Sequence, residues 1–220
     1  MNSSYPKRFF ICVLGLAIFG FGTFLGVQAG SAGTNAWNTL AIGISGRSGI
    51  SFGTSNLLIG LVIILIDLLG KGKIGIGTFL NAFLVSWFAD LFLRLLTFIP
   101  PASNAVTGVL YTLAGQTLLT FSTILYMTAG LGCGPRDTLM VIIGKRLPKA
   151  PIGIVKFCLE AAALIVGILL GAPFGIGTVL VMALQASIFQ FACHVTRYEP
   201  RRIHHENLLD TARNLFSKAA

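Results

Sequence analysis

An internal repeat, with a spacing of about 100 residues, is the feature that most constrains the fold of this chain. Gly75-Ile76-Gly77-Thr78 recurs unchanged as Gly175-Ile176-Gly177-Thr178, and Ala29-Gly30 recurs as Ala129-Gly130. Asn38-Thr39-Leu40 corresponds to Asp137-Thr138-Leu139, one position out of that register. Several matches in nearly one register indicate two related halves rather than a coincidence of composition.

Six charge-poor apolar stretches divide the chain. Only 10% of its 220 residues are charged and 55% are hydrophobic, whereas a soluble domain carries roughly 25% charged residues. Each stretch approaches the ~20 residues that a helix needs to cross a bilayer. We therefore predict an all-α polytopic membrane protein, with spans at residues 9–29, 53–70, 76–97, 106–130, 152–171 and 174–195.

The basic residues gather on one side of the predicted membrane. With the N-terminus in the cytoplasm, the inner side receives Lys7, Arg8, Lys71, Lys73, Arg136, Lys145, Arg146, Lys149 and the basic residues of the tail. The outer loops receive Arg47 alone. This bias follows the positive-inside rule and places both termini in the cytoplasm. It also accounts for the net charge of +9 without nucleic acid, which we do not expect as a partner.

The number of spans in each half has a topological consequence. Between a cytoplasmic N-terminus (1–8) and a basic tail (197–220), the first membrane repeat covers residues 9–97 and the second covers 106–195. Three spans in each repeat would insert the two halves in opposite orientations. Secondary transporters are commonly built in this way, with a site near the midplane between the repeats. The tail has the apolar spacing of an amphipathic helix lying on the inner membrane surface.

Each half also contains a glycine-rich hinge followed by a short apolar segment. The hinges cover residues 29–35 and 129–135, and the segments cover 36–46 and 136–147. These segments are too short to span a bilayer, so we predict re-entrant or interfacial helices. Irregular backbone at membrane depth is stable only inside protein or beside a wet cavity. The predicted hinge and turn residues are Gly33, Gly132, Gly134, Pro135, Gly75, Gly77, Thr78, Gly175, Gly177 and Thr178.

Charged residues inside a span are costly and by default mark a functional site. The sequence pairs Asp90 with Arg94, Lys156 with Glu160, and Asp67 with Lys71, each four residues apart. The first two pairs either neutralise each other on one helix face or face the interior and exchange partners with a substrate. For Asp67 we expect an interfacial ion pair.

Polar residues also mark the start of both short segments. Asn38 and Asp137 occupy related positions there, and Asp137 follows Arg136 directly. Either residue is suited to cap the helix that follows. The alternative is a role in substrate binding or gating, since free amides at a helix start favour an anion.

The hinge motifs resemble those of the YczE/YyaS/YitT family of bacterial membrane proteins. They are Gly33-x-x-Ala36-Trp37-Asn38 and Gly132-x-Gly134-Pro135-Arg136-Asp137. The Gly-x-Gly-Thr turns and Lys156 with Glu160 extend the resemblance over residues 8–195. The chain departs from the family pattern at Ala36 and Asn38, where the family favours Pro and Asp. The resemblance implies a polytopic protein of the bacterial cytoplasmic membrane, without a particular substrate or catalytic residue.

Our leading hypothesis is a small inner-membrane transporter that moves a small polar or amphiphilic solute by alternating access. The predicted substrate-binding residues are Asn38, Arg136, Asp137, Asp90, Lys156 and Glu160. In this hypothesis Arg136 and Lys156 bind anionic groups, and Asp90 or Glu160 carries a coupling proton.

The alternative is an accessory protein that supports a partner membrane protein or enzyme without transporting a solute. A homodimer is as compatible with the chain as a monomer. The spans contain no His-Glu-x-x-His motif and no Ser-His pair. We therefore expect no enzymatic activity, no cofactor and no bound metal.

Overall fold

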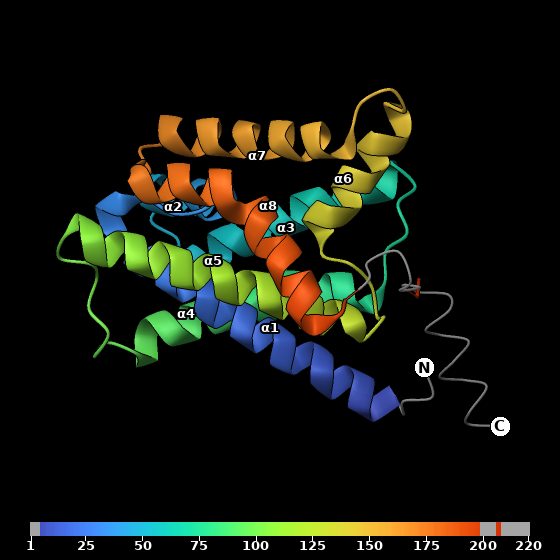
Figure 1. The fold of residues 1–220 in the computed structure, drawn as a ribbon, viewed down its shortest axis with the longest axis horizontal. Helices are drawn as coiled ribbons and strands as arrows, with labels where there is room; N and C mark the ends of the chain where they lie inside the picture. The colour runs from blue at the N-terminus through green and yellow to red at the C-terminus, as the bar shows by residue number, and fades with distance from the viewer. Residues whose placement is uncertain (1–4, 199–205, 208–220) are drawn as a thin grey trace.

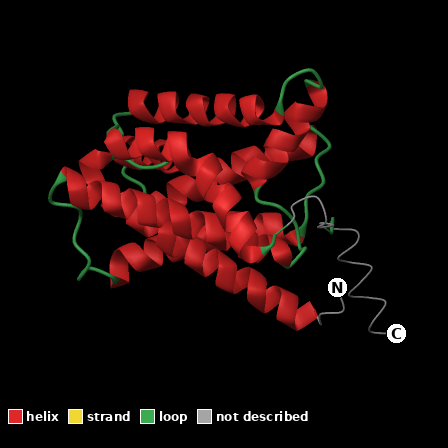
Figure 2. Cartoon of the chain, in the orientation of Figure 1, coloured by secondary structure: helices red, strands yellow, loops and turns green. Residues whose placement is uncertain are grey.

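The computed structural model describes residues 5–198 and 206–207, and in these ranges every regular element is a helix (Figures 1 and 2). The predicted helix of the tail lies outside the described residues. The elements are α1 (Tyr5–Gln28), η1 (Gly30–Ala32), α2 (Ala36–Ser48), α3 (Phe52–Leu69), α4 (Ile76–Leu95), α5 (Ala105–Thr128), α6 (Pro135–Arg146), α7 (Ile152–Leu169) and α8 (Ile176–Thr196).

Six of these helices are long and apolar enough to cross a membrane, as predicted: α1, α3, α4, α5, α7 and α8. The ends of α1 differ most from the predicted span, because this helix begins at Tyr5 rather than at residue 9. Arg8 finds polar partners in the fold, so its charge does not end the helix. The short helices α2 and α6 have 13 and 12 residues and match the two predicted short segments.

The order of long and short helices is the same in the two halves. In Figure 1, α1 runs away from the end that holds the N-terminus, whereas α5 runs towards that end. The two helices pack along each other. A Cβ atom on Gly22 of α1 would lie 2.8 Å from the carbonyl oxygen of Gly115 in α5, so small residues set this close crossing.

Each short helix packs against the opposite half. Helix α2 packs on α7, and α6 packs on α3. At the first crossing, a Cβ atom on Gly43 would lie 2.7 Å from the carbonyl oxygen of Gly167. Both short helices are therefore held by contacts that the other half of the chain supplies.

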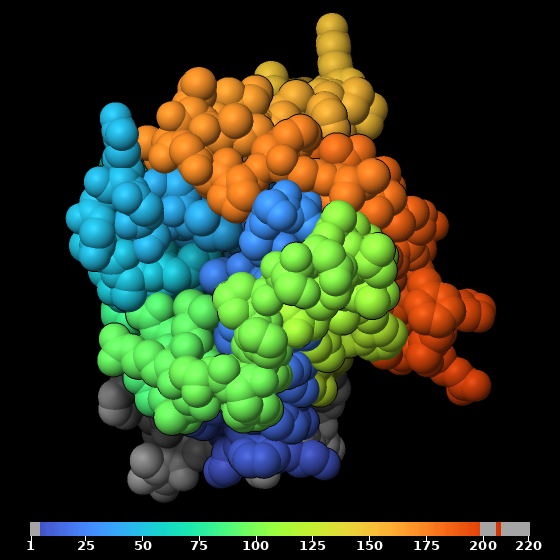
Figure 3. All heavy atoms as spheres, turned by 90° about the vertical axis from the view of Figure 1, so that its left-hand side faces the viewer, coloured from blue at the N-terminus to red at the C-terminus, as the bar shows by residue number. Residues whose placement is uncertain are grey.

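The two ends of the bundle differ in charge. The end with the N-terminus also holds the α3–α4 and α6–α7 turns (Figure 1), which carry the exposed residues Lys71, Lys73 and Lys149. The opposite end, which faces the viewer in Figure 3, holds the α2–α3 turn, the linker 96–104 between α4 and α5, and the α7–α8 turn. Arg47 lies at that end. This sidedness agrees with the loop charges seen in the sequence.

Candidate functional site

The second hinge leads into α6 with a backbone suited to start a helix. Gly134 is the N-cap residue and Pro135 occupies the first helical position, where its missing N–H costs nothing. The hydroxyl of Tyr126 in α5 accepts a hydrogen bond from the Gly134 N–H at 3.2 Å. Arg136 and Asp137 follow directly, so the hinge places both side chains in the first turn of α6.

Arg136 lies where four helices meet, its own α6 and the helices α2, α3 and α4 that carry its partners. Its Nη2 donates to the Oδ1 of Asn56 at 2.7 Å, and the Nδ2 of Asn56 donates to the Ser86 hydroxyl at 2.9 Å. Its guanidinium lies 4.8 Å from the ring centroid of Trp37, a cation–π contact. Among the described residues no carboxylate lies within 4.0 Å of this guanidinium. The hydrogen-bond and ring partners of this cation are therefore both neutral.

The Asp137 carboxylate lies close to the hinge backbone. A Cβ atom on Gly134 would lie 3.4 Å from an Asp137 carboxylate oxygen and 3.5 Å from the Oδ1 of Asn81. Asp137 belongs to α6, which is not one of the six spans. Burial raises the pKa of its carboxyl, while the positive charges of Lys156 and Arg136 oppose that shift. Asp137 is thus electrostatically linked to a second charged pair on α7.

That second pair is Lys156 and Glu160. Their Nζ and Oε1 atoms are 3.8 Å apart, so the pairing within one helix is confirmed. Glu160 is buried and also accepts a hydrogen bond from Gln185 of α8, whereas the Lys156 side chain is half exposed. The negative charge of Glu160 also acts on Arg136. Four of the six predicted binding residues therefore form one electrostatically connected group.

Asp90 is separate from this group. Its carboxylate accepts hydrogen bonds from the Ser51 hydroxyl and, at 2.7 Å, from the Gly53 N–H at the start of α3. Of the two alternatives for Asp90 and Arg94, the ion pair within α4 does not form, and Arg94 is exposed. Free amides at a helix start need acceptors. The partner of the Asp90 carboxylate is therefore the start of α3 and not Arg94.

A hollow of about 310 Å³ lies between α3 and α4 beside Asp90. Its polar lining consists of Thr54, Ser86, Asp90 and Arg94, and the apolar side includes Trp87. Ser86 is also the residue that accepts from Asn56. One hydrogen-bonded chain therefore connects the wall of the hollow to Arg136.

Asn38 is buried but does not cap α2. The N-cap is Asn35, whose Oδ1 accepts from the Asn38 N–H at 3.0 Å. The Nδ2 of Asn38 has no acceptor among the described residues. A Cβ atom on Gly26 of α1 would lie 2.9 Å from it. Capping is thus the wrong account of Asn38, as it is of Asp137, because neighbouring residues hold the cap positions in both halves.

The Gly-Ile-Gly-Thr turns pack on the hinges of the opposite halves. The Gly77 N–H donates to the Leu131 carbonyl at 2.8 Å, and the Thr78 hydroxyl donates to the Cys133 carbonyl at 2.7 Å. In the other direction, a Cβ atom on Gly177 would lie 2.8 Å from the carbonyl oxygen of Ala32. Backbone approaches this close require glycine. The predicted turn residues therefore connect the two halves.

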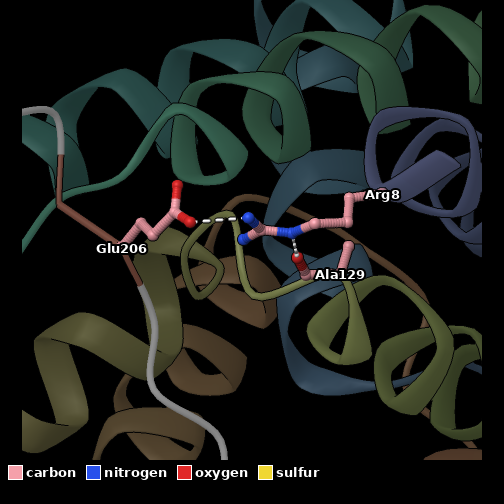
Figure 4. Close-up of polar contacts among 3 residues, drawn as sticks. All are labelled: Arg8, Ala129 and Glu206. Atoms are coloured by element: carbon pink, nitrogen blue, oxygen red, sulfur yellow. Dashed lines mark hydrogen bonds and ion pairs between the residues drawn. The ribbon is translucent and has the colours of Figure 1, made fainter. Parts of the chain in front are cut away.

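Segments far away in the sequence also form hydrogen bonds with each hinge. Figure 4 shows those of the second hinge, which come from Arg8 and Glu206. Arg8 donates from Nε to the Ala129 carbonyl at 2.7 Å and pairs with Glu206 at 2.6 Å. The Glu206 N–H donates to the Gly130 carbonyl at 3.0 Å. The sequence carries no local signal for this contact, because its partners lie far apart along the chain.

Asp67 also has a different environment from the one expected. It is fully buried near the end of α3, whereas Lys71 is exposed, and the expected ion pair between them is wrong. Lys71 has a φ of 58°, in the tight turn that follows α3. This turn directs the two residues apart.

Four residues of the site were not among the predicted binding residues, although Trp37 belongs to the first hinge motif. They are Asn56, Ser86, Trp37 and Tyr126.

Comparison with known proteins agrees with this description. A family of unknown function (DUF6198) matches residues 6–194. An uncharacterized protein of Haemophilus influenzae is 33% identical over 189 residues, which cover 86% of this chain and 84% of that protein. The uncharacterized membrane protein YczE of Bacillus subtilis is 30% identical over 194 residues, with 87% and 88% covered. No solved structure matches. The chain therefore belongs to the DUF6198 family and is a YczE-like multi-pass membrane protein.

Proposed function

We propose that this protein transports a small polar or amphiphilic solute that carries an anionic group. The observation that carries the proposal is the Arg136 guanidinium, which is held inside the bundle by Trp37 and Asn56 without a carboxylate partner among the described residues. A cation kept inside a membrane protein is expensive unless it has a function. A carboxylate or phosphate of the solute would supply the missing counter-charge.

In this proposal the two halves are inverted repeats that rock around the Arg136 cluster. The opposite directions of α1 and α5 and the exchange of α2 and α6 between the halves support this arrangement. The short helices would be re-entrant, each entering from its own side of the membrane. The basic end of the bundle would face the cytoplasm of a bacterium, in keeping with the positive-inside rule.

The other predicted binding residues would each have a different role in transport. Asp137, Lys156 and Glu160 share an electrostatic environment with Arg136, so the Lys156–Glu160 pair would open when the solute binds. On the first short helix, Asn38 offers a buried amide donor that has no acceptor among the described residues.

Asp90 lines the hollow between α3 and α4. In this proposal it shapes the hollow, because its hydrogen bonds fix the start of α3. An amphiphile would enter through this hollow, which is lined by both polar and apolar side chains.

A thermal-shift screen of the detergent-purified protein against a library of small anions tests this proposal. A ligand that binds the folded state raises the unfolding temperature. We expect a hit that is lost in Arg136→Gln and kept in Arg47→Gln, because Arg47 is an exposed arginine in the last turn of α2, outside the proposed site. Hits that survive in Arg136→Gln would contradict the assignment of Arg136 to the site.

An accessory role is the second candidate, and the position of α7 favours it. This helix lies at one edge of the bundle, in contact with α2 and α6 (Figures 1 and 3). Its exposed apolar residues are Ile152, Ile154, Phe157, Ile165, Val166, Ile168 and Leu169. Such a face suits either lipid or a partner helix. Replacing Phe157 and Ile165 with alanine would abolish the cellular function but leave anion binding intact if the protein is an accessory.

A further inference from the structure

Asp67 is a buried acid that the proposed transport site does not use. It lies on the buried stripe of α3 that also contains Asn56 and Ile63, about three turns from Asn56. Its exposed fraction is 0%, and neither carboxylate oxygen has a hydrogen-bond donor among the described residues. No described Lys, Arg or His lies within 4.0 Å of it.

The turn that follows Asp67 packs against α6. The chain turns sharply after α3, and the Gly72 N–H donates to the Asp67 carbonyl at 2.8 Å. A Cβ atom on Gly72 would lie 2.7 Å from Ile142 and 3.0 Å from Thr138, both on α6. Asp67 thus lies where α3, its following turn and the short helix of the other half meet.

The charged groups on the elements around Asp67 are all engaged elsewhere or exposed. On α6, Arg136 binds Asn56, and Asp137 lies beside Tyr126 at the hinge. On α4, Asp90 binds the start of α3, near the opposite end of that helix. The remaining charged residues on the turn, α4 and α6 are exposed: Lys71, Lys73, Arg94, Lys145 and Arg146. None of them supplies a counter-charge to Asp67.

An ionised carboxylate in such a position is strongly destabilising, because nothing replaces its lost hydration. The protonated acid avoids most of this cost. The fold itself does not require an acid here, since the related position in the second half is Gly167. There, α2 approaches so closely that a Cβ atom on Gly167 would lie 2.7 Å from the Leu40 nitrogen. The first half has a carboxyl where the second has close backbone packing.

We infer that Asp67 is a proton-binding site at the crossing of α3 and α6. The carboxyl keeps its proton while α6 covers it. When α6 moves away and water enters, the O–H bond breaks, the proton passes to water and the carboxylate remains. The site depends on the proposed function only for its use, which is to couple proton movement to transport. The bound proton itself is a property of the folded chain.

The pH dependence of stability tests this inference. A proton held by the folded state and released on unfolding makes stability fall as pH rises. We expect the unfolding temperature of the wild type to fall relative to that of Asp67→Asn as pH rises above about 4, the ordinary pKa of an aspartate in an unfolded chain. The asparagine variant has the shape of the protonated acid and no proton to lose. Asp90→Asn is the control, because that carboxylate has donors. The inference would be overturned if the unfolding temperature of the wild type minus that of Asp67→Asn stayed constant or increased as pH rises.

If Asp67→Asn does not fold, modification of the wild-type protein with dicyclohexylcarbodiimide decides the matter. This apolar reagent takes up the carboxyl proton on nitrogen while the carboxyl oxygen bonds to its central carbon, and rearrangement leaves a stable acylurea. Mass spectrometry should locate the adduct on the peptide containing Asp67, in a yield that declines as pH rises. Absence of this adduct, or a yield independent of pH, would refute the proton site. A loss of anion binding in Arg136→Gln bears on the transport proposal alone, so the two can fail separately.

Discussion

The two hinges have the same backbone plan but are fastened by different chemistry. Gly30 and Gly130 both have positive φ, at 58° and 67°. In each half, the segment after the last span returns to its own hinge and donates a backbone N–H: Ala102 to the Gln28 carbonyl at 2.8 Å, and Glu206 to the Gly130 carbonyl at 3.0 Å. The repeat therefore extends beyond the spans to the segments that follow them.

The difference lies in the side chains that complete each fastening. At the first hinge, the neutral Gln28 amide donates to the Ile99 carbonyl at 2.8 Å, and the linker 96–104 is continuous with helices at both ends. At the second hinge, Arg8 and Glu206 form an ion pair between segments near the two ends of the chain. The first fastening is thus insensitive to charge, whereas salt or a competing anion weakens the second. Of the two hinges, the one at the basic end is the more easily released.

Replacing the turn glycines should have the largest effect, because it separates the hinges from the opposite halves. In Gly177→Val, the new side chain would meet Ala32 and Thr112 within 3 Å, and overpacking of this kind costs about 3 kcal/mol. We expect a large loss of folded protein in size-exclusion chromatography and a lower unfolding temperature. Gly46→Val is the control, since nothing lies within 4 Å of a Cβ atom there. Equal behaviour of the two variants would show that the turn does not bear on the hinge.

Arg8→Ala should have the next largest effect. It removes a charge-assisted hydrogen bond to Ala129 and the ion pair with Glu206, a loss of about 2 kcal/mol. The difference in unfolding temperature from the wild type should shrink in high salt, because salt weakens the ion pair that the wild type keeps. A difference independent of salt would mean that Arg8 acts through packing rather than charge.

Gln28→Ala gives the matched change at the first hinge. It removes one neutral hydrogen bond to Ile99, worth about 1 kcal/mol. We expect a smaller drop in unfolding temperature than for Arg8→Ala, and the same drop at low and high salt. A salt-dependent effect of Gln28→Ala would remove the contrast between the hinges.

Glu206→Gln should have the smallest effect. The amide oxygen still accepts from Arg8, and only the charge is lost, at a partly exposed site where pairs contribute less than about 1 kcal/mol. The expected readout is faster hydrogen exchange of the amides after Ala129, with little change in the unfolding temperature. Unchanged exchange at the second hinge would show that its backbone bonds suffice to hold it.

The sequence predicts local features of this fold well and tertiary partners poorly. The spans follow from local hydropathy, and the hinges follow from glycines that recur at one spacing along the chain. Both signals can be read without knowing which residues meet in space. The four-residue spacing correctly pairs Lys156 with Glu160. The same rule fails for Asp90, because the start of another helix binds it. It fails for Asp67 because the turn directs Lys71 outward.

The candidate site shows the same division. The hinge motif identifies Arg136 and Asp137 as residues of interest from their type and place. The partners of Arg136 in the structure, Asn56 and Trp37, come from the other half of the chain. A single sequence contains no signal for contacts between residues so far apart. The polar character of Asn56 within a span was the one available hint.

Because each turn packs on the hinge of the opposite half, the hinge contacts can form only in a fixed order during synthesis. The amide of Gly77 emerges from the ribosome well before Leu131, its acceptor. The first hinge waits longer still, because Gly177, whose backbone lies against Ala32, comes with the last span. A nascent chain released early would enter the bilayer with an unmatched polar backbone at its centre. Membrane quality control would therefore have a feature by which to tell truncated chains from finished ones.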